Sequence, residues 1–118
     1  MPTFSQGDVV RVPFPYTDRN TRQHRPALVV SDGPVGDGGA LLWVAMITSA
    51  ENRAWSNDHP IEAFAEAGLP IPSVVRPTKI TTIEAREAEA VGRLDDALTA
   101  QVMTTIGGLL GGLSRGAS

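Results

Sequence analysis

The chain has 118 residues, which is enough for one domain with a core of its own and too few for two. It contains no cysteine, and this excludes a disulfide framework, a thiolate zinc site and a cysteine nucleophile. The formal net charge of −3 argues against a general nucleic-acid coat, for which a basic balance is expected. We therefore expect a single domain over residues 1–118, with a disordered tail after about residue 113.

The sequence shows no segment that would place the chain in a membrane. Its start lacks the basic and apolar regions of a signal peptide. Its longest apolar run, Ala40 to Ile47, is far shorter than the ~20 residues needed to cross a bilayer. Together with the missing cysteines, this predicts a soluble, cytoplasmic protein with no membrane partner.

Positive charge gathers in one segment of this acidic chain. Residues 11–25 carry four arginines and one aspartate, a local charge of +3, whereas residues 84–96 carry two arginines and five acidic residues, a local charge of −3. A local basic patch suits a small footprint on a phosphate backbone. The alternative is that these arginines are ordinary solvated surface residues.

The first half of the chain predicts three strands. Gly7 to Phe14 alternates apolar and polar residues, and Pro13 within it indicates an edge or a bulge. A long polar loop is expected from Pro15 to His24. Two apolar strands follow, separated by a turn rich in Gly, Pro and Asp. The second is expected to be the longest strand, with Trp43 in the core; their ranges are Ala27–Ser31 and Ala40–Ser49.

The second half predicts further short strands and then a helix. The strand candidates are His59–Glu62, Ser73–Arg76, Lys79–Glu84 and Ala90–Leu94, with a helical turn expected before Gly68. Many strands with short connections favour a mainly-β fold, a closed barrel or sandwich. One C-terminal helix capped by Asp95 is then expected, because apolar residues recur at helical spacing; they are Leu98, Val102, Ile106 and Leu109. Gly107 and the glycines after it should weaken its end.

Candidate chemistry lies at the predicted strand ends. Arg25 stands where the basic loop enters a strand, Thr48 and Ser49 end the apolar strand, and Arg76 closes another. Guanidinium groups match a phosphodiester bidentately, and hydroxyls donate to its oxygens. The alternative is that the hydroxyls are ordinary strand termini and Arg76 is a surface residue.

Other site types find little support in the sequence. The only histidines, His24 and His59, lie in no metal-ligand spacing, so we expect no metal and no cofactor. The glycines from Gly33 to Gly39 lack the Lys-Ser or Lys-Thr of a phosphate loop and predict a turn. No nucleophile elbow of a serine hydrolase is present.

Five segments closely resemble motifs of the MazF/PemK family of toxins, and they occur in the family's order. They are Gly7–Asp18, Arg25–Ser31, Ile47–Ser49, Pro72–Arg76 and Val91–Leu94. The first two are the most specific. The resemblance covers nearly the whole chain, from about Gly7 to the helix beyond Asp95.

This resemblance implies a small SH3-like barrel with a C-terminal helix, assembled as a homodimer. It implies a metal-independent endoribonuclease, the toxin of a type II toxin–antitoxin system, which cleaves single-stranded RNA and is neutralised by a cognate antitoxin. Arg25 matches the family's catalytic arginine and Thr48 its catalytic threonine. Ser49 and Arg76 match positions that contact or help to cleave the RNA in some members. Some relatives carry an acidic residue two places after Arg76, where this chain has Thr78.

For the metal-independent reaction that the resemblance implies, we expect the ribose 2′-OH to attack the adjacent phosphorus and give a 2′,3′-cyclic phosphate and a 5′-OH. Further RNA contacts are expected in the basic loop at Tyr16, Arg22 and His24. Tyr16 and Trp55 could stack on unpaired bases, with structural packing as the alternative. His24 is the nearest titratable candidate for the base. We nevertheless expect it to be a loop residue or a phosphate contact, because neighbours on a strand face opposite ways.

Two other functions remain open at this point. One is a toxin of the CcdB type that binds DNA gyrase, although the chain ends in Ser114–Ser118 and lacks the Trp-Gly-Ile ending of those proteins. The other is a catalytically inactive interaction domain with the same barrel.

Overall fold

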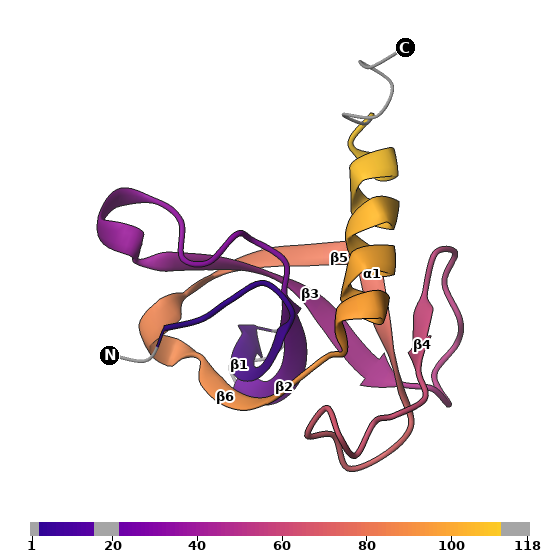
Figure 1. Ribbon diagram of the computed structural model, residues 1–118. Coiled ribbons are helices and arrows are strands. Elements are labelled where there is room, and N and C mark those ends of the chain that lie inside the picture. The colour runs from indigo at the N-terminus through magenta and orange to yellow at the C-terminus, as the bar shows by residue number, and fades with distance from the viewer. Residues whose placement is uncertain (1–2, 16–21, 112–118) are drawn as a thin grey trace.

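The computed structural model describes residues 3–15 and 22–111 and shows a curled β-sheet with one α-helix against it (Figure 1). In chain order the elements are β1 (Asp8–Pro15), β2 (Arg22–Val29), η1 (Asp37–Gly39), β3 (Leu41–Ser49), β4 (His59–Ile61), β5 (Ser73–Glu84), η2 (Ala85–Glu87), β6 (Glu89–Arg93) and α1 (Asp96–Leu109). The expectation of a mainly-β domain with a C-terminal helix is confirmed.

The six strands of the described chain form one antiparallel sheet in the order β4-β5-β3-β2-β1-β6. The sheet is curled into a half-barrel rather than closed, because β4 and β6 lie at its two edges. Both edge strands are short: β4 has three residues, and β6 pairs with β1 only from Asp8 to Arg11. Pro13 therefore lies where β1 has β2 as its single partner, which agrees with the expected edge position.

The middle of the curled sheet is buried on both faces, and stretches such as residues 27–29 of β2 and 44–47 of β3 are continuously apolar for this reason. Inside the curl lies a core that includes Val10, Val12 and Val44. On the opposite face, Ala45 and Ile47 pack with residues of α1 and of the segment between β4 and β5. Because side chains alternate along each strand, a central strand contributes residues to both cores.

Two strands begin or run differently from the prediction. The predicted polar loop ends early, because β2 begins at Arg22 and includes His24. The two strands predicted on either side of Pro77 are one strand, β5, which is the longest of those described. Met46 of β3 pairs with Arg76 and Ala45 pairs with Ile80, so the three residues between them bulge out of the ladder. The bulge accommodates a proline that cannot donate to the ladder.

The prediction that Trp43 belongs to the core is wrong, because its side chain is 51% exposed. Trp43 faces the same side of β3 as Ala45 and Ile47, but it lies further along the strand. Its partner on β5, Thr82, is exposed as well. The core that Ala45 and Ile47 form with α1 therefore ends before it reaches Trp43 and Thr82.

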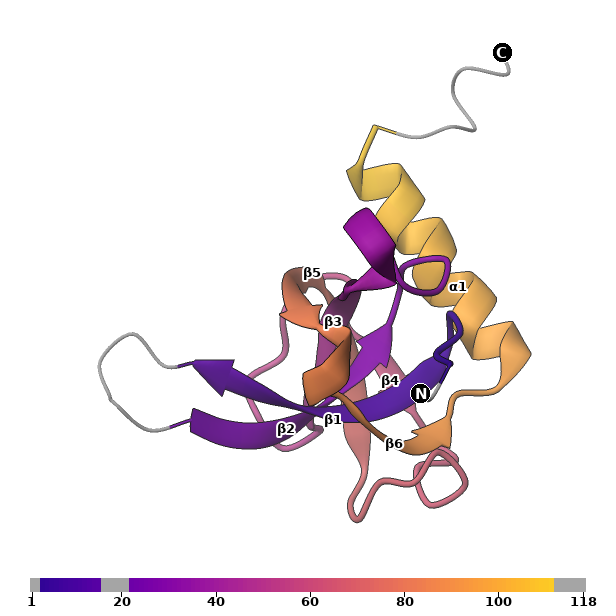
Figure 2. The same cartoon turned by 90° about the vertical axis from the view of Figure 1, so that its left-hand side faces the viewer.

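Helix α1 rises along one side of the sheet, and its C-terminal end extends beyond the strands (Figure 2). The predicted cap is confirmed, since the carboxylate of Asp95 accepts a hydrogen bond of 2.7 Å from the backbone N–H of Leu98. Val102 and Ile106 are buried as predicted, whereas Leu109 is exposed. The predicted disordered tail lies outside the described residues. Among the helices described, none has the length and apolar character needed to span a bilayer.

Candidate active site

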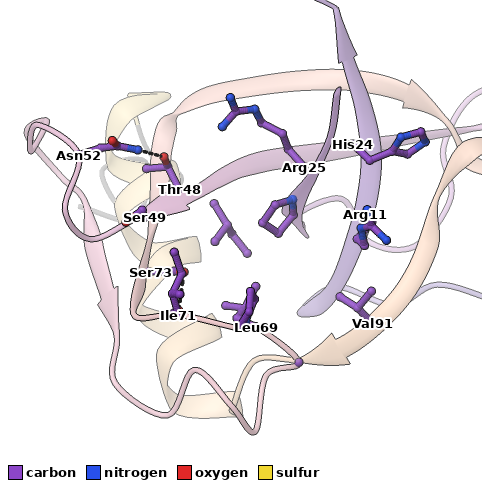
Figure 3. Close-up of a pocket in the computed structure, with 14 residues that line it drawn as sticks. Arg11, His24, Arg25, Thr48, Ser49, Asn52, Leu69, Ile71, Ser73 and Val91 are labelled. Carbon is purple, nitrogen blue, oxygen red and sulfur yellow. Dashed lines mark hydrogen bonds between the residues drawn. The ribbon is translucent and has the colours of Figure 1, made fainter. Parts of the chain in front are cut away.

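Arg25 and Thr48 lie on one face of the sheet, at the end of the ladder between β2 and β3. The ladder pairs Ala27 with Met46, and the same register continued by two residues sets Arg25 opposite Thr48. Residues two apart on a strand point to the same face. Arg25 therefore points to the side of Ala27, Thr48 points to the side of Met46, and these are the same side of the sheet. Figure 3 shows the guanidinium of Arg25 extending towards the side where Thr48 and Asn52 lie.

The hydroxyl of Thr48 is held in place by a residue of the loop after β3. The side-chain amide of Asn52 donates a hydrogen bond of 2.6 Å to Oγ1 of Thr48. Thr48 itself is only 6% exposed. Its hydroxyl oxygen thus has a fixed partner, while its own hydrogen remains available to a ligand.

A cavity of about 520 Å³ opens at the same end of the ladder (Figure 3). Arg25 and Thr48 stand at its margin, because their neighbours Pro26 and Ile47, which belong to its apolar wall, face the opposite side of the strands. Its walls are largely apolar and come from β2, β3, β6 and the segment before β5; they include Pro26, Ile47, Leu69, Pro70, Ile71 and Val91. Polar groups stand around it, and the described lining residues include two arginines and no carboxylate. Such a surface suits a ligand that carries both negative charge and a flat apolar ring. We call it the site cavity.

Two serine hydroxyls of the site cavity have local partners. Oγ of Ser49 accepts a hydrogen bond of 3.1 Å from the backbone N–H of Glu51. The hydroxyl of Ser73 donates one of 2.9 Å to the carbonyl of Ile71. Ser49 therefore lies at the site, as the sequence predicts, and keeps its own hydroxyl hydrogen for another acceptor.

His24 lines the site cavity at the end away from Thr48. It is exposed, belongs to β2 rather than to a loop, and points away from Arg25 (Figure 3). The expectation of a loop residue is therefore wrong, whereas the expected opposite orientation of the two neighbours is confirmed. Arg11 lies near this end and approaches Glu89 at 3.8 Å, with both side chains largely exposed.

Arg76 does not line the site cavity. It is buried against the loop between β3 and β4, where it forms an ion pair of 3.0 Å with Asp58. Its guanidinium carbon lies 4.2 Å from the ring centroid of Trp55, so one face of this indole packs on Arg76. The alternative of a surface arginine is wrong, and its contact with RNA stays a prediction.

The remaining predicted contacts are less defined. Tyr16 lies outside the described residues. Arg22 is the first residue of β2, and its side chain is not among those described. Within residues 3–15 and 22–111, no three His, Asp or Glu side chains gather in a way that could hold a metal ion.

Sequence reasoning missed two residues of this region, Asn52 and Asp58. Asp58 is 18 positions before the arginine that it pairs with, and Asn52 lies in a polar loop with no motif. Only the spacing of four residues between Thr48 and Asn52, just after a predicted strand end, could have suggested a local side-chain contact.

The fold is shared with solved structures of MazF toxins. A MazE–MazF structure from Deinococcus radiodurans superposes with a TM-score of 0.76 at 22% sequence identity, over 94% of this chain and 98% of the other. The toxin MazF-mt6 from Mycobacterium tuberculosis gives 0.65 at 23% identity, over 87% and 96%. An endoribonuclease in complex with its cognate antitoxin, from a mycobacterial species, gives 0.63 at 19% identity, over 95% and 97%.

The sequence comparison identifies the family. Residues 5–110 match the family described as the PemK-like, MazF-like toxin of type II toxin–antitoxin system. A search of the curated proteins finds no match. The match covers most of the chain, so this protein belongs to the PemK/MazF toxin family, as its motifs suggest.

Proposed function

We propose that this protein is an endoribonuclease toxin that cleaves single-stranded RNA without a metal ion. The observation that carries the proposal is the placement of Arg25 and Thr48 on one face, beside a cavity whose described lining has no carboxylate. A phosphodiester fits such a site, because a guanidinium donates to its two non-bridging oxygens and a hydroxyl can donate to one of the same oxygens. Membership of the PemK/MazF family supports the same conclusion.

The reaction is an internal transfer at phosphorus. The ribose 2′-oxygen forms a new bond to the adjacent phosphorus, and the bond from phosphorus to the 5′-oxygen of the next nucleotide breaks. The 2′-OH gives its proton to a base, and the departing 5′-oxygen gains a proton. The products are one strand ending in a 2′,3′-cyclic phosphate and one beginning with a 5′-OH, so atoms and charge balance without water.

The described residues supply charge stabilisation and orientation. The Arg25 guanidinium stabilises the charge that builds on the phosphoryl oxygens and is the residue assigned to donate to the leaving oxygen. One such preorganised donor is typically worth about 3–4 kcal/mol of transition-state stabilisation. Thr48 orients the phosphate through its hydroxyl hydrogen, and Ser49 is the second hydroxyl beside it.

The site cavity accounts for the preference for single strands. Its apolar walls would pack against the flat face of an unpaired base, which a stacked duplex does not offer. The exposed part of Trp55 is a second surface for stacking, in the same loop as Asn52. RNA contacts by Tyr16, Arg22, His24 and Arg76 belong to this proposal as predictions.

The partners follow from the family. Two of the similar structures are toxins solved with an antitoxin, which supports a cognate antitoxin protein as the regulator of this chain. We assign a homodimer on the same ground. Sedimentation equilibrium of the purified protein, alone and with a candidate antitoxin, tests both assignments.

The test of the activity is incubation of the purified protein with a long single-stranded RNA in an excess of EDTA. The expected result is discrete fragments from the single strand and none from the same sequence annealed into a duplex. An intact, folded protein that leaves the single strand uncut would contradict the proposal. Cleavage that appears only after Mg²⁺ is restored would contradict its metal-independent part.

A further inference from the structure

The loop between β3 and β4, residues 50–58, is fastened to β5 by one buried charge pair. Nε of Arg76 donates to Oδ1 of Asp58 at 3.1 Å, and Nη2 donates to Oδ2 at 3.0 Å. The side chains of Arg76 and Asp58 are only 7% and 9% exposed. This bidentate geometry joins the end of the loop to the sheet with little freedom.

The same two residues also hold the middle of the loop. Nη2 of Arg76 donates a further hydrogen bond of 2.8 Å to the carbonyl of Arg53. Oδ2 of Asp58 accepts one of 2.9 Å from the backbone N–H of Trp55, whose ring covers the guanidinium. Three points of the loop therefore depend on the pair.

Asp58 is kept ionised by these contacts. Burial by itself would raise the pKa of its carboxyl group. The hydrogen bonds from Arg76 and from the Trp55 backbone, with the positive charges of Arg76 and His59, outweigh burial and hold the pKa below its usual value. The pair is therefore a charged pair at neutral pH.

The start of the loop carries the residue that touches Thr48. The backbone N–H of Ala50 donates to the carbonyl of Pro72 at 3.0 Å, and the backbone N–H of Asn52 donates to the carbonyl of Ser49 at 3.1 Å. Asn52 is thereby aimed at Thr48, and its amide occupies a lone pair of Oγ1. This bond uses one of the two lone pairs of Oγ1, and it fixes the oxygen so that the hydroxyl hydrogen can be directed at a ligand.

We propose that Asn52, Asp58 and Arg76 are positioning residues: the buried pair fixes the loop, and the loop holds Asn52 so that the Thr48 hydroxyl donates to the phosphate. The inference rests on the proposed function, because it takes Thr48 as the group that meets the substrate. It also gives Arg76 a role that requires no contact with RNA. The chain of contacts runs from β5 through the loop to the end of β3.

The first arm of the test is a double-mutant cycle on Thr48 and Asn52, read as kcat and KM for RNA cleavage. Asn52→Ala should lower kcat about tenfold with little change in KM. Asn52→Asp should lower it further, because a carboxylate accepts the hydroxyl hydrogen that the phosphate needs. Asn52→Ala should cost nothing more in a Thr48→Ala background, and Ser56→Ala, an exposed change in the same loop, should match the wild type. Additive losses would overturn the inference.

The second arm separates a positioning role of Arg76 from a phosphate contact. Asp58→Asn and Arg76→Gln should lower kcat to a similar degree and speed the hydrogen exchange of the loop amides. If Arg76 instead binds RNA, Asp58→Asn releases the guanidinium and removes a negative charge, so KM should fall or stay constant. Circular dichroism of both variants checks that the fold survives. If either variant fails to fold, the Asn52 variants still test the inference.

An RNA-free measurement distinguishes failure of this inference from failure of the proposed function. Thr48→Val should shift the side-chain amide NMR signals of Asn52 in the free protein. A wild type that leaves RNA uncut overturns the proposed function and this role together, even if the signals shift. An active wild type with unshifted signals and an additive cycle overturns this role alone.

Discussion

Arg25 combines a fixed place at the end of a sheet ladder with the planar, cationic fork of a guanidinium. In the proposed reaction it stabilises oxygens that become more negative in the transition state, so its loss should be felt in kcat. Arg25→Ala should slow RNA cleavage by a factor on the order of 100 or more. Arg25→Lys should recover part of the rate, because lysine keeps the positive charge but lacks the paired N–H donors of the guanidinium.

Arg86→Ala is the matched control for this substitution. Arg86 is exposed, and its Nε lies 2.8 Å from the carboxylate of Glu84, two residues before it. Its loss should leave the rate unchanged, whereas a folded Arg25→Ala variant with wild-type activity would show that the assignment is wrong.

His24 is the neighbour of Arg25 but faces the other way, so it is poorly placed to take the 2′-OH proton at the same phosphate. His24→Ala should cost less than tenfold in kcat, and the acid limb of the pH–rate profile should survive. A loss as large as that of Arg25→Ala, with the acid limb abolished, would establish His24 as the base.

Asp58 makes part of the stability of the fold depend on pH. Its pKa is lowered in the folded protein, so the stability it contributes is present above the unfolded pKa of about 4 and is lost as pH falls through the lower folded value. Asp58→Asn should cost about 3 kcal/mol at pH 7, because it leaves a buried guanidinium without its charge partner. Urea unfolding at several pH values checks this, and the gap between the two proteins should narrow below pH 4. A gap independent of pH would contradict it.

At the scale of elements, the wall of the site cavity depends on a close crossing of two backbone segments. A Cβ on Gly92 would collide with the backbone carbonyl of Ala67, and one on Gly68 with that of Val91. Gly68 also has a φ of 87°, where side chains are strained. The two glycines let the segment before β5 lie directly on β6, which brings Leu69 and Val91 to the same cavity.

This crossing predicts opposite effects for two glycine-to-alanine changes. Gly92→Ala should lower the melting temperature by several degrees or prevent folding, because the clash is with backbone and cannot be relieved by a rotamer change. Gly107→Ala lies in α1 with open space around it and should stabilise the protein by roughly 0.5–1 kcal/mol. Thermal unfolding of both variants is the measurement, and equal effects would argue against the crossing.

The elements also show where local sequence patterns were sufficient. The alternation in β1 and the cap at Asp95 depend on residues within a few positions, and both were predicted correctly. The continuity of β5 through Pro77 depends on its pairing with β3, which resumes on the far side of the bulge. The exposure of Trp43 depends on where the core on the α1 face ends. Neither is encoded within a short window of the chain.

At the scale of the whole molecule, the curled sheet sets Arg25, inside β2, beside the end of β3, which is distant in sequence. The sequence alone suggested Arg25, Thr48 and Ser49 as strand-end residues, and resemblance to the family gave the first two their roles. Asn52 and Asp58 could not be predicted, because their partners are chosen by the path of a nine-residue loop over β5 rather than by a motif. The open half-barrel, in place of a closed one, likewise follows from short edge strands that no single segment reveals.

The measurement that tests the account most directly uses a single-stranded RNA whose cleavage position has been mapped with the wild-type protein in EDTA. A second RNA of the same sequence carries one 2′-deoxy nucleotide, immediately 5′ of the scissile phosphate. The account predicts that the first RNA yields a 2′,3′-cyclic phosphate and a 5′-OH, and that the second is not cut at that bond. Cleavage of the deoxy-substituted bond at the unmodified rate would contradict attack by the 2′-OH and with it the proposed mechanism.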